Sequence, residues 1–285
     1  MKCRGCFNME KILFGKPVAE YLDRKSLSAF NVYEEQNGQK ASIGAITVGD
    51  DPASMLYVKR KEEKAEELNV SFHWKKLHKD ATQEDVSEVI NEFSSLNGII
   101  LQLPIPGHLN ADELIDLIPP GLDVDGLTKT NLGTLFESKP LFAPATPKAI
   151  LELFNYYDID LQGKDVLVLG RSRLVTAPLS RLLSSESCNS TVTVLHSKSK
   201  NINEKIKSAD IVVSAIGKPY FLNHTDFKEG AIVIDVGISQ KDKGVYGDVD
   251  PENTSDKLYA RSPYPGGVGP VTVSALYSNL AILIS

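Results

Sequence analysis

The stretch of this sequence that decides the fold is Lys164-Asp-Val-Leu-Val-Leu-Gly170, which continues as Arg-Ser-Arg-Leu-Val-Thr-Ala-Pro178. A short apolar run that ends on glycine is typical of a buried parallel strand, and the pattern from about Val175 to Ser184 predicts a helix after it. A glycine between a strand and a helix forms an anion site, because free backbone N–H groups and the helix dipole point at a phosphate. Only Gly170 of the usual G-x-G-x-x-G is present, so an ordinary strand-to-helix turn stays open as the alternative.

Three further apolar runs, at 191–195, 211–216 and 231–236, predict neighbouring strands of the same sheet. The last two of these runs stop on Gly217 and Gly237. Ligands of open parallel sheets lie outside the carboxyl ends of the strands, and glycine there lets a flat ring approach the backbone closely. We therefore expect this half of the chain to bind a dinucleotide.

The strand at 191–195 is followed by His196-Ser-Lys198, without the carboxylate that binds the ribose hydroxyls in NAD enzymes. A hydroxyl and a cation at this position, with Arg171 opposite, suit a 2′-phosphate instead. The pattern therefore favours NADP over NAD. The alternative is that His196 and Lys198 are solvated residues at the end of a strand.

The first half of the chain alternates between strand and helix in the same way. Asp51 is a good N-cap and Pro52 fits the first helical position. We expect strands at 41–48, 70–77 and 98–103 and helices at 52–68, 84–93, 112–118, 147–157 and 272–284. Proline and glycine interrupt the pattern from Pro119 to Pro147, which indicates an irregular connection and a domain boundary. The alternation predicts an α/β fold of two domains with parallel sheets and a cleft between them.

Composition limits the class of protein. The chain has 285 residues, a net charge of −6 and no basic cluster, so we expect no nucleic-acid partner. No apolar run approaches the roughly 18 residues of a membrane helix, and no signal peptide is recognisable, so we expect no membrane association. Three cysteines suit a reducing compartment, and we expect a cytoplasmic protein. Cys3-x-x-Cys6 has no second pair to complete a zinc site, and Met9 is a candidate start of the native chain.

Tyr57 and Lys61 are the first candidates for chemistry, because they lie four residues apart on a predicted helix and share a face. A lysine that is desolvated beside an aromatic ring in a cleft can act as an acid or base near neutral pH. The alternative is a surface cation, since the same helix carries Lys59, Arg60 and Lys64.

Three other features have both a functional and a structural interpretation. Gln102 is an amide inside an apolar run, so it is either satisfied in the core or directed into a site. Asp123 and Asp125 form a D-x-D-G motif, but the other EF-hand ligands are missing, and we expect no metal. The segment 262–272 contains three glycines and three prolines, which predicts a rigid backbone cradle leading into the last helix.

Together these segments resemble the family of bifunctional methylenetetrahydrofolate dehydrogenase/methenyltetrahydrofolate cyclohydrolases, called FolD in bacteria. The resemblance extends from about Ile12 to Leu280, with the motifs in the order and spacing of the family. These motifs are Ser54-x-x-Tyr57-x-x-x-Lys61, Gln102-Leu-Pro104, Asp123-Val-Asp-Gly126, Pro144-x-Thr146-Pro147, Gly170-Arg-Ser172, His196-Ser197, Asp235-Val-Gly237, Gly247-Asp-Val249 and Pro265-Gly-Gly-Val-Gly-Pro270. No single motif is specific, but the ordered set is.

The resemblance implies two coupled reactions of tetrahydrofolate derivatives in one-carbon metabolism: oxidation of 5,10-methylenetetrahydrofolate with NADP, then hydrolysis of the methenyl product to 10-formyltetrahydrofolate. It implies that Lys61 transfers protons, that Gln102 tunes it, that Tyr57 stacks on the folate and that Asp125 holds the pterin. The implied substrate site comprises Ser54, Tyr57, Pro104, Asp125, Gly269 and Pro270. The implied cofactor site comprises Gly170, Arg171, Ser172, Ser197, Ala215, Gly217, Asp235, Gly237 and Ile238.

The resemblance also implies a homodimer, a catalytic domain at 1–145 that the helix at 271–285 joins, and a Rossmann-type NADP domain at 146–270. Thr176 departs from the family, which has glycine there, and a β-branched residue is expected to crowd the helix start or the pyrophosphate. A dehydrogenase without hydrolase activity and a non-catalytic dinucleotide-binding protein stay open as alternatives.

Overall fold

The computed structural model describes residues 10–137, 140–223, 225–241, 244–252 and 257–285. Cys3, Cys6 and Met9 lie outside these ranges. The chain forms two compact units, which are named here by their larger sheets. Of the described residues, 19–148 and 272–285 form the three-stranded unit, and 10–18 and 149–271 form the six-stranded unit. Each unit is thus built from two separate segments of the chain.

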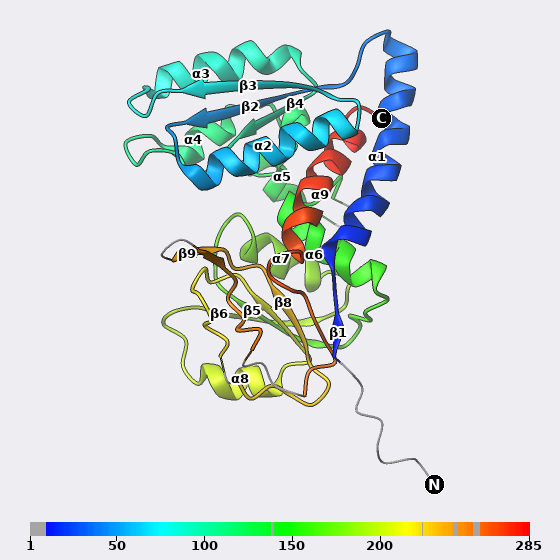
Figure 1. Cartoon of the computed structure of the whole chain (residues 1–285), viewed down its shortest axis with the longest axis vertical. Coiled ribbons are helices and arrows are strands. Elements are labelled where there is room, and N and C mark those ends of the chain that lie inside the picture. Colours follow the sequence, from blue (N-terminus) through cyan, green and yellow to red (C-terminus); the bar gives the residue numbers. More distant parts are fainter. Residues whose placement is uncertain (1–9, 138–139, 224, 242–243, 253–256) are drawn as a thin grey trace. The chain divides into compact units, whose positions relative to one another are not determined.

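The three-stranded unit is built on a parallel sheet with strand order β3-β2-β4 (Figure 1). Its strands are β2 (Ser42–Val48), β3 (Ser71–Leu77) and β4 (Gly98–Leu101). The helices between and after them are α2 (Pro52–Glu67), α3 (Gln83–Glu92) and α4 (Ala111–Asp116). All of these elements lie within a few residues of their predicted positions.

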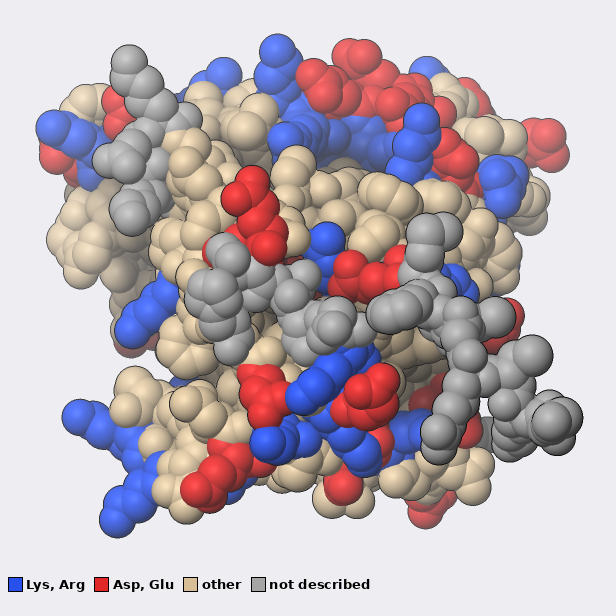
Figure 2. All heavy atoms as spheres, turned by 60° about the horizontal axis from the view of Figure 1, so that its bottom comes forward, with Lys and Arg blue, Asp and Glu red and all other residues tan. Residues whose placement is uncertain are grey.

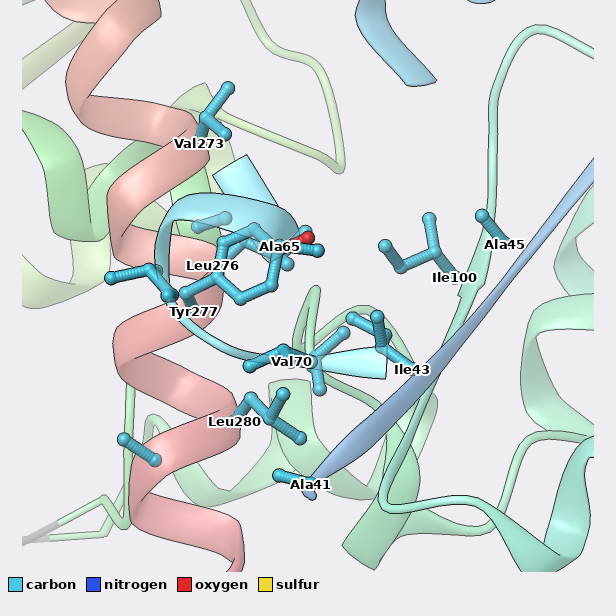
Figure 3. Packing of buried hydrophobic residues seen from close by; sticks show 14 of the residues in the cluster. Ala41, Ile43, Ala45, Ala65, Val70, Ile100, Val273, Leu276, Tyr277 and Leu280 are labelled. Atoms are coloured by element: carbon cyan, nitrogen blue, oxygen red, sulfur yellow. The ribbon is translucent and has the colours of Figure 1, made fainter. Parts of the chain in front are cut away.

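Two long helices at the ends of the chain complete this unit, α1 (Gly15–Asn37) and α9 (Val268–Leu283). Figure 3 shows the core that they help to form, in which Tyr277 and Leu280 of α9 pack with Ile43 of β2 and Ala65 of α2. Phe30 of α1 belongs to the same buried cluster. Burial of such apolar surface stabilises the unit by about 25 cal/mol for each Å² removed from water.

The six-stranded unit has the strand order β1-β11-β8-β7-β5-β6, and every neighbouring pair is parallel. Its strands are β1 (Lys11–Ile12), β5 (Asp165–Leu169), β6 (Thr191–Leu195), β7 (Ile211–Ser214), β8 (Ile232–Asp235) and β11 (Ala260–Arg261). Helices α6 (Ala145–Tyr156), α7 (Thr176–Leu183) and α8 (Ile202–Ser208) accompany it. A separate antiparallel pair joins β9 (Ser239–Lys241) to β10 (Gly244–Tyr246).

The order of strands in the six-stranded sheet defines where a ligand can bind. The chain leaves β5 for β6 on one side and then returns to β7 on the other side. In open α/β sheets the crevice outside the carboxyl ends of the strands at such a switch point is the usual ligand site. The end of β5, at Gly170, is therefore placed as the sequence predicts.

The stretch 119–147 is more regular than the sequence indicates. It contains a 3₁₀ turn (Pro120–Leu122) and a short helix, α5 (Lys129–Thr134). The Thr128 side chain caps α5 by accepting a hydrogen bond from the Asn131 amide, 3.2 Å away. The prediction of an irregular connection is wrong at this point, because a local cap stabilises a single helical turn between the proline-rich parts.

Charges of both signs mix on the surface. Figure 2 shows lysine and arginine side chains interspersed with aspartate and glutamate on the face that it draws. In the six-stranded unit, for example, Asp226 lies between Lys207 and Lys257. Among the helices that the structure describes, none combines the length and the apolar character that crossing a bilayer requires.

Candidate active site and cofactor site

The turn from β2 into α2 follows from its local sequence. The Asp51 carboxylate accepts a hydrogen bond of 2.8 Å from the Ser54 amide, and Pro52 occupies the first helical position. The start of a helix leaves its first N–H groups without partners. The Asp51 carboxylate accepts a hydrogen bond from one of them, and Pro52 has no N–H to satisfy. The predicted N-cap is confirmed, and more than two turns later α2 presents Lys61 as a buried residue with 7% of its surface exposed.

Asp123 holds the segment that follows the 3₁₀ turn. It forms a parallel bridge with β4, and its buried carboxylate accepts hydrogen bonds from the Gly126 amide (3.0 Å), the Thr128 amide (2.8 Å) and Asn131 Nδ2 (2.9 Å). These donors occupy both of its oxygens. Asp123 therefore shapes the turn, and the chain carries Asp125 to the carboxyl end of β4.

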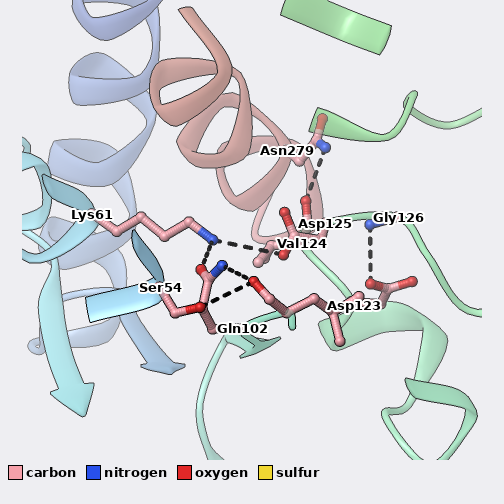
Figure 4. A network of polar contacts seen from close by, with 9 residues as sticks. Ser54, Lys61, Gln102, Asp123, Val124, Asp125, Gly126 and Asn279 are labelled. Atoms are coloured by element: carbon pink, nitrogen blue, oxygen red, sulfur yellow. Dashed lines mark hydrogen bonds and ion pairs between the residues drawn. The ribbon is translucent and has the colours of Figure 1, made fainter. Parts of the chain in front are cut away.

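Lys61, Gln102 and Asp125 meet at that end of β4 (Figure 4). Lys61 Nζ donates to Gln102 Oε1 at 3.1 Å and lies 3.8 Å from Asp125 Oδ2. The amide nitrogen of Gln102 donates to the Leu103 carbonyl at 2.8 Å, which fixes the oxygen of Gln102 toward the lysine. Three residues that the sequence offered as separate candidates thus form one polar cluster.

Asp125 has unusual electrostatics within this cluster. Burial raises its pKa above the ordinary value for an aspartate, the Lys61 ammonium lowers it, and the Asp123 carboxylate raises it. A carboxylate with a raised pKa is a better proton acceptor than an exposed one. The cluster therefore places a proton donor and a proton acceptor side by side. Among the described residues, no group of three or more His, Cys, Asp or Glu side chains forms a metal site.

The other predicted substrate residues of this unit surround the cluster. Tyr57 lies one turn before Lys61 and is half-buried, and the guanidinium of Arg60 lies 5.9 Å from the centre of its ring. Burial raises the pKa of the Tyr57 phenol, an effect that Arg60 opposes, so the phenol is protonated at neutral pH. Ser54 Oγ donates to the Leu103 carbonyl at 3.4 Å, and Pro104 is exposed beyond it.

In the six-stranded unit, glycines shape the carboxyl ends of β5 and β7. Gly170 has φ +122°, and a Cβ on it would lie 2.8 Å from the Ala215 carbonyl oxygen, so no other residue fits. Ala215 continues β7 by donating its amide to the Leu169 carbonyl at 2.9 Å, and Gly217 follows with φ +73°. Glycine thus leaves the backbone without a side chain on both sides of the switch point, which allows a flat cofactor to approach it closely.

Residues 171–175 lead from Gly170 to the start of α7 at Thr176. Ser172 Oγ accepts hydrogen bonds from the amides of Val175 (3.2 Å) and Thr176 (3.5 Å), which leaves its O–H proton free to donate to a phosphate. Thr176 is fully buried, and its hydroxyl donates to the Ser172 carbonyl at 3.3 Å. Its methyl group lies 3.1 Å from the position of a Cβ on Gly170. Thr176 thus packs beneath the turn rather than on the solvent side.

Arg171 and Ser197 follow neighbouring strands. Leu169 of β5 pairs with Leu195 of β6, and the Gly170 amide donates to the Leu195 carbonyl at 2.8 Å. Each of the two side chains comes two residues after this pair, and both are exposed. A guanidinium and a hydroxyl therefore lie at adjacent strand ends, an arrangement that fits a phosphate.

Two buried carboxylates organise the loops beyond β7 and β8. Asp235 accepts hydrogen bonds from the amides of Gly237 (3.1 Å), Asp248 (3.0 Å) and Val249 (2.9 Å). Asp248 in turn accepts from Ser214 Oγ (2.7 Å) and from the amides of Ile216 and Lys218 (both 2.8 Å). Burial raises the pKa of Asp235 to about 6, while its three backbone donors lower it and Asp248 raises it. Asp235, a predicted cofactor residue, thus directs its carboxylate at the backbone.

The remaining predicted residues lie on the same unit. A Cβ on Gly237 would lie 2.1 Å from the Asp248 carboxylate, so glycine is required there, and Ile238 beside it is exposed. Gly269 and Pro270 form part of the first turn of α9, and nothing lies within 4 Å of a Cβ on Gly269.

Sequence reasoning missed several polar residues that support these sites. Asp248 stands in a motif that marked the family, but the sequence gave it no role. Tyr277 and Asn279 lie in the predicted last helix without an assigned role, although both are fully buried and hydrogen-bonded. A polar side chain at a buried position of an otherwise apolar helix was the available signal.

Comparison with known proteins identifies the family. The model of the tetrahydrofolate dehydrogenase/cyclohydrolase catalytic domain matches residues 13–125, and the model of the NAD(P)-binding domain of the same family matches residues 144–285. This chain belongs to the tetrahydrofolate dehydrogenase/cyclohydrolase family. The resemblance predicted from the ordered motifs is confirmed, as is the α/β fold of two domains with parallel sheets.

Individual members of the family are similar over almost their whole length. The bifunctional protein FolD of Methanoculleus marisnigri is 40% identical over 272 residues, which cover 94% of each chain. The bifunctional FolD structure from Campylobacter jejuni aligns with a TM-score of 0.90 at 34% identity, covering 96% of this chain and 98% of that one. The Trypanosoma brucei FolD, solved with NADP and an inhibitor, aligns with a TM-score of 0.90 at 30% identity over 96% and 97%. NADP, the predicted cofactor, agrees with the matched domain and with this last structure.

Proposed function

We propose that this chain oxidises 5,10-methylenetetrahydrofolate with NADP and hydrolyses the 5,10-methenyl product to 10-formyltetrahydrofolate. Membership of the family and the names of its relatives support both steps. The observation that carries the hydrolytic step is the buried ammonium of Lys61, which lies 3.1 Å from Gln102 Oε1 and 3.8 Å from Asp125 Oδ2. A protein that only binds dinucleotides has no need of this desolvated group.

We assign the folate site to the side chains around this cluster. The half-buried ring of Tyr57 offers a face for stacking, and Asp125 accepts hydrogen bonds from the pterin. Ser54 and Pro104 line the same strand end. We also assign Gly269 and Pro270, in the first turn of α9, to the binding of the folate; nothing lies within 4 Å of a Cβ on Gly269.

The cofactor site follows from the switch point of the six-stranded sheet. The glycine-lined ends of β5 and β7 give the backbone surface, and Ser172 and the start of α7 face the pyrophosphate. Arg171 and Ser197 bind the 2′-phosphate. Ala215, Gly217, Gly237 and Ile238 form the loops against the rest of the cofactor, and Asp235 holds these loops in place.

The oxidation needs alignment more than it needs an acid or a base. Bound NADP supplies the acceptor for the hydride that leaves the methylene carbon. The chain contributes by holding the folate and excluding water, since well-oriented neighbours react far faster than free ones. Tyr57 holds the folate for this purpose by stacking, and Asp125 holds its pterin by hydrogen bonds.

The hydrolysis needs proton transfer. Water adds to the methenyl carbon and loses one proton. The hydroxyl that results loses its second proton as the bond from that carbon to N5 breaks and the formyl C=O forms. N5 takes up one proton, so that one proton is released overall. The Lys61–Asp125 pair supplies the donor and the acceptor for these transfers, and Gln102 Oε1 fixes one N–H direction of the lysine. Asp125 is suited to accept a proton because burial raises its pKa.

A paired assay tests this function. The protein is mixed with methylenetetrahydrofolate and either NADP or NAD, and the formation and decay of the methenyl absorbance are followed by stopped flow. We expect NADP to give the higher specificity constant and the methenyl signal to decay faster than in buffer alone. Stoichiometric accumulation of methenyl product would support the dehydrogenase-only alternative, and no oxidation with either cofactor would support the non-catalytic one.

Lys61→Met separates the two steps, with Lys59→Met as the matched control. Both lysines lie on α2, but Lys59 is exposed and Lys61 is buried at the cluster. We expect Lys61→Met to lose hydrolysis by about 10²–10⁴-fold, the usual contribution of a positioned acid or base, and to retain more of the oxidation. Full hydrolysis by Lys61→Met, or equal losses in both variants, would contradict the assignment.

We also propose a homodimer formed through the six-stranded unit. β6 lies at the end of the strand order, and Thr191, Thr193 and Val194 on it are exposed. An open edge strand can pair with a second copy about a two-fold axis. Light scattering coupled to size exclusion should give twice the chain mass of 31.2 kDa, and a charged substitution at Val194 should shift the mass toward the monomer.

A further inference from the structure

Helix α9 contains two polar side chains where an apolar helix would suffice for packing. Tyr277 and Asn279 are both 0% exposed, although they lie in a helix that forms part of the core of the three-stranded unit. Burying a hydroxyl or an amide is unfavourable unless each polar atom finds a partner. The partners that these two side chains find lie on the segments that carry Lys61 and Asp125.

Tyr277 contacts the backbone of the lysine itself. Its hydroxyl donates to the carbonyl oxygen of Lys61, with an O···O distance of 2.5 Å. Burial raises the pKa of this phenol well above its usual value, so the hydroxyl keeps its proton and acts as a donor. The bond ties α9 to α2 at the residue whose side chain enters the cluster.

Asn279 contacts the segment of the carboxylate. Its Nδ2 donates to the carbonyl oxygens of Val124 and Ala143, both at 2.9 Å, and its Oδ1 accepts from Lys148 Nζ at 3.0 Å. Figure 4 shows the bond to Val124, the residue directly before Asp125. The amide nitrogen thus binds the backbone at the two ends of the 124–143 connection, and the amide oxygen binds Lys148.

We infer that Tyr277 and Asn279 are positioning residues for the hydrolytic reaction, which together set the separation of Lys61 and Asp125. One helix holds the backbone of both partners, so the 3.8 Å between the ammonium and the carboxylate is fixed through α9 rather than by the pair alone. Neither residue touches the reacting atoms. The inference rests on the proposed function, and it goes beyond that function by assigning residues outside the family motifs.

Position matters here because the coupling of the pair depends on distance. The attraction between two charges falls with their separation, and a displacement of about 1 Å in an active site can reduce a rate by about a hundredfold. The Lys61 ammonium lowers the pKa of Asp125, so a larger separation would let that pKa rise further. The acidity of Asp125 therefore reports the geometry even when no substrate is present.

Three variants test the inference. Asn279→Ala removes all three hydrogen bonds of the amide. Tyr277→Phe removes one hydroxyl and keeps the ring in the core, so it still tests the inference if Asn279→Ala does not fold. Ile43→Ala is the matched control, because Ile43 is fully buried in the same cluster but contacts neither Lys61 nor the 124–143 connection through a polar group.

The measurements are the kcat of methenyl hydrolysis, the KM for NADP, and the titration of Asp125 by ¹³C NMR in the free protein, assigned with Asp125→Asn. We expect Asn279→Ala to lower the hydrolytic kcat by about tenfold to a hundredfold and Tyr277→Phe by about threefold to tenfold. The KM for NADP should stay within twofold, since the cofactor binds to the other unit. The pKa of Asp125 should rise in Asn279→Ala and stay unchanged in Ile43→Ala.

Two results would overturn the inference. One is an Asp125 titration that does not differ between the wild type, Asn279→Ala and Tyr277→Phe. The other is a loss of kcat in Ile43→Ala as large as in Asn279→Ala, because that would attribute the effect to stability rather than position. If the wild type lacks hydrolytic activity, the proposed function fails, but the titration of Asp125 still decides whether α9 sets the geometry.

Discussion

Replacing Asp235 by asparagine should change how the stability of this protein depends on pH. Asp235 is 3% exposed, and burial raises its pKa to about 6, from an ordinary value of 3.8. The folded protein therefore binds a proton at this site more tightly than the unfolded chain. The site contributes stability that is fully present below about pH 4 and is lost as the pH rises to about 6.

The magnitude follows from the difference between the two pKa values. That difference is 6 − 3.8, or about 2.2 units, and each unit corresponds to about 1.4 kcal/mol, which gives about 3 kcal/mol. Asparagine does not titrate. Its amide nitrogen would face a backbone amide that now donates to Asp235, and the lost hydrogen bond destabilises the variant equally at every pH. The advantage of the wild type over Asp235→Asn should thus shrink by about 3 kcal/mol between pH 4 and pH 7.

Urea unfolding followed by far-ultraviolet circular dichroism, at half-unit steps from pH 4 to pH 7.5, measures this difference. Asp226→Asn is the control, because its carboxylate is exposed between Lys207 and Lys257 and its pKa is lowered to about 2. Its contribution is present above about pH 4 and is lost as the pH falls from about 4 to about 2, so its curve should stay nearly parallel to the wild type over the measured range. The difference in unfolding free energy between wild type and Asp235→Asn could instead be constant or grow with pH. Either result would show that the three amide donors lower the pKa of Asp235 by more than burial raises it.

Three further changes test other parts of the site. Arg171→Ala should raise the KM for NADP by about tenfold or more while leaving that for NAD nearly unchanged, since a guanidinium–phosphate pair is lost; equal effects on both cofactors would contradict the 2′-phosphate assignment. Thr176→Gly should lower the melting temperature without improving NADP affinity, because Thr176 is buried beneath the turn; tighter NADP binding would show that the side chain crowds the cofactor. Asp248→Asn should cost about 1–3 kcal/mol of unfolding free energy and speed amide exchange at Ile216 and Lys218, because asparagine cannot accept from all three donors; unchanged exchange would exclude this role.

The sequence was most informative where local chemistry decides the structure. The helix start at Asp51 and Pro52, and the bare strand end at Gly170, depend on neighbouring residues and were predicted correctly. The family motifs also indicated that Lys61, Gln102 and Asp125 belong to one site, although their spacing in the sequence does not predict that their side chains are in contact. That meeting depends on the bridge between Asp123 and β4, which joins residues far apart in the sequence.

Other features could not be derived from the pattern. Helix α1 was not predicted. Its buried residues Val18, Leu22 and Phe30 follow a helical spacing, but a serine, Ser26, interrupts the apolar stripe. Ser26 is accommodated there because its hydroxyl donates to the Leu22 carbonyl at 3.0 Å. The role of Asn279 depends on three partners more than 120 positions away, and long-range partners of this kind leave no local signal.

The discontinuity of the three-stranded unit has a consequence for synthesis. Residues 272–285 leave the ribosome only after the whole of 149–271, yet they supply the tyrosine and asparagine that hold Lys61 and Asp125. Domains generally fold as units while the chain grows, so the six-stranded unit can form first and the sheet of β2, β3 and β4 must wait for its last helix. A chain that is terminated before Tyr277 would therefore have a folded six-stranded unit, but its Lys61 and Asp125 would not be held in place.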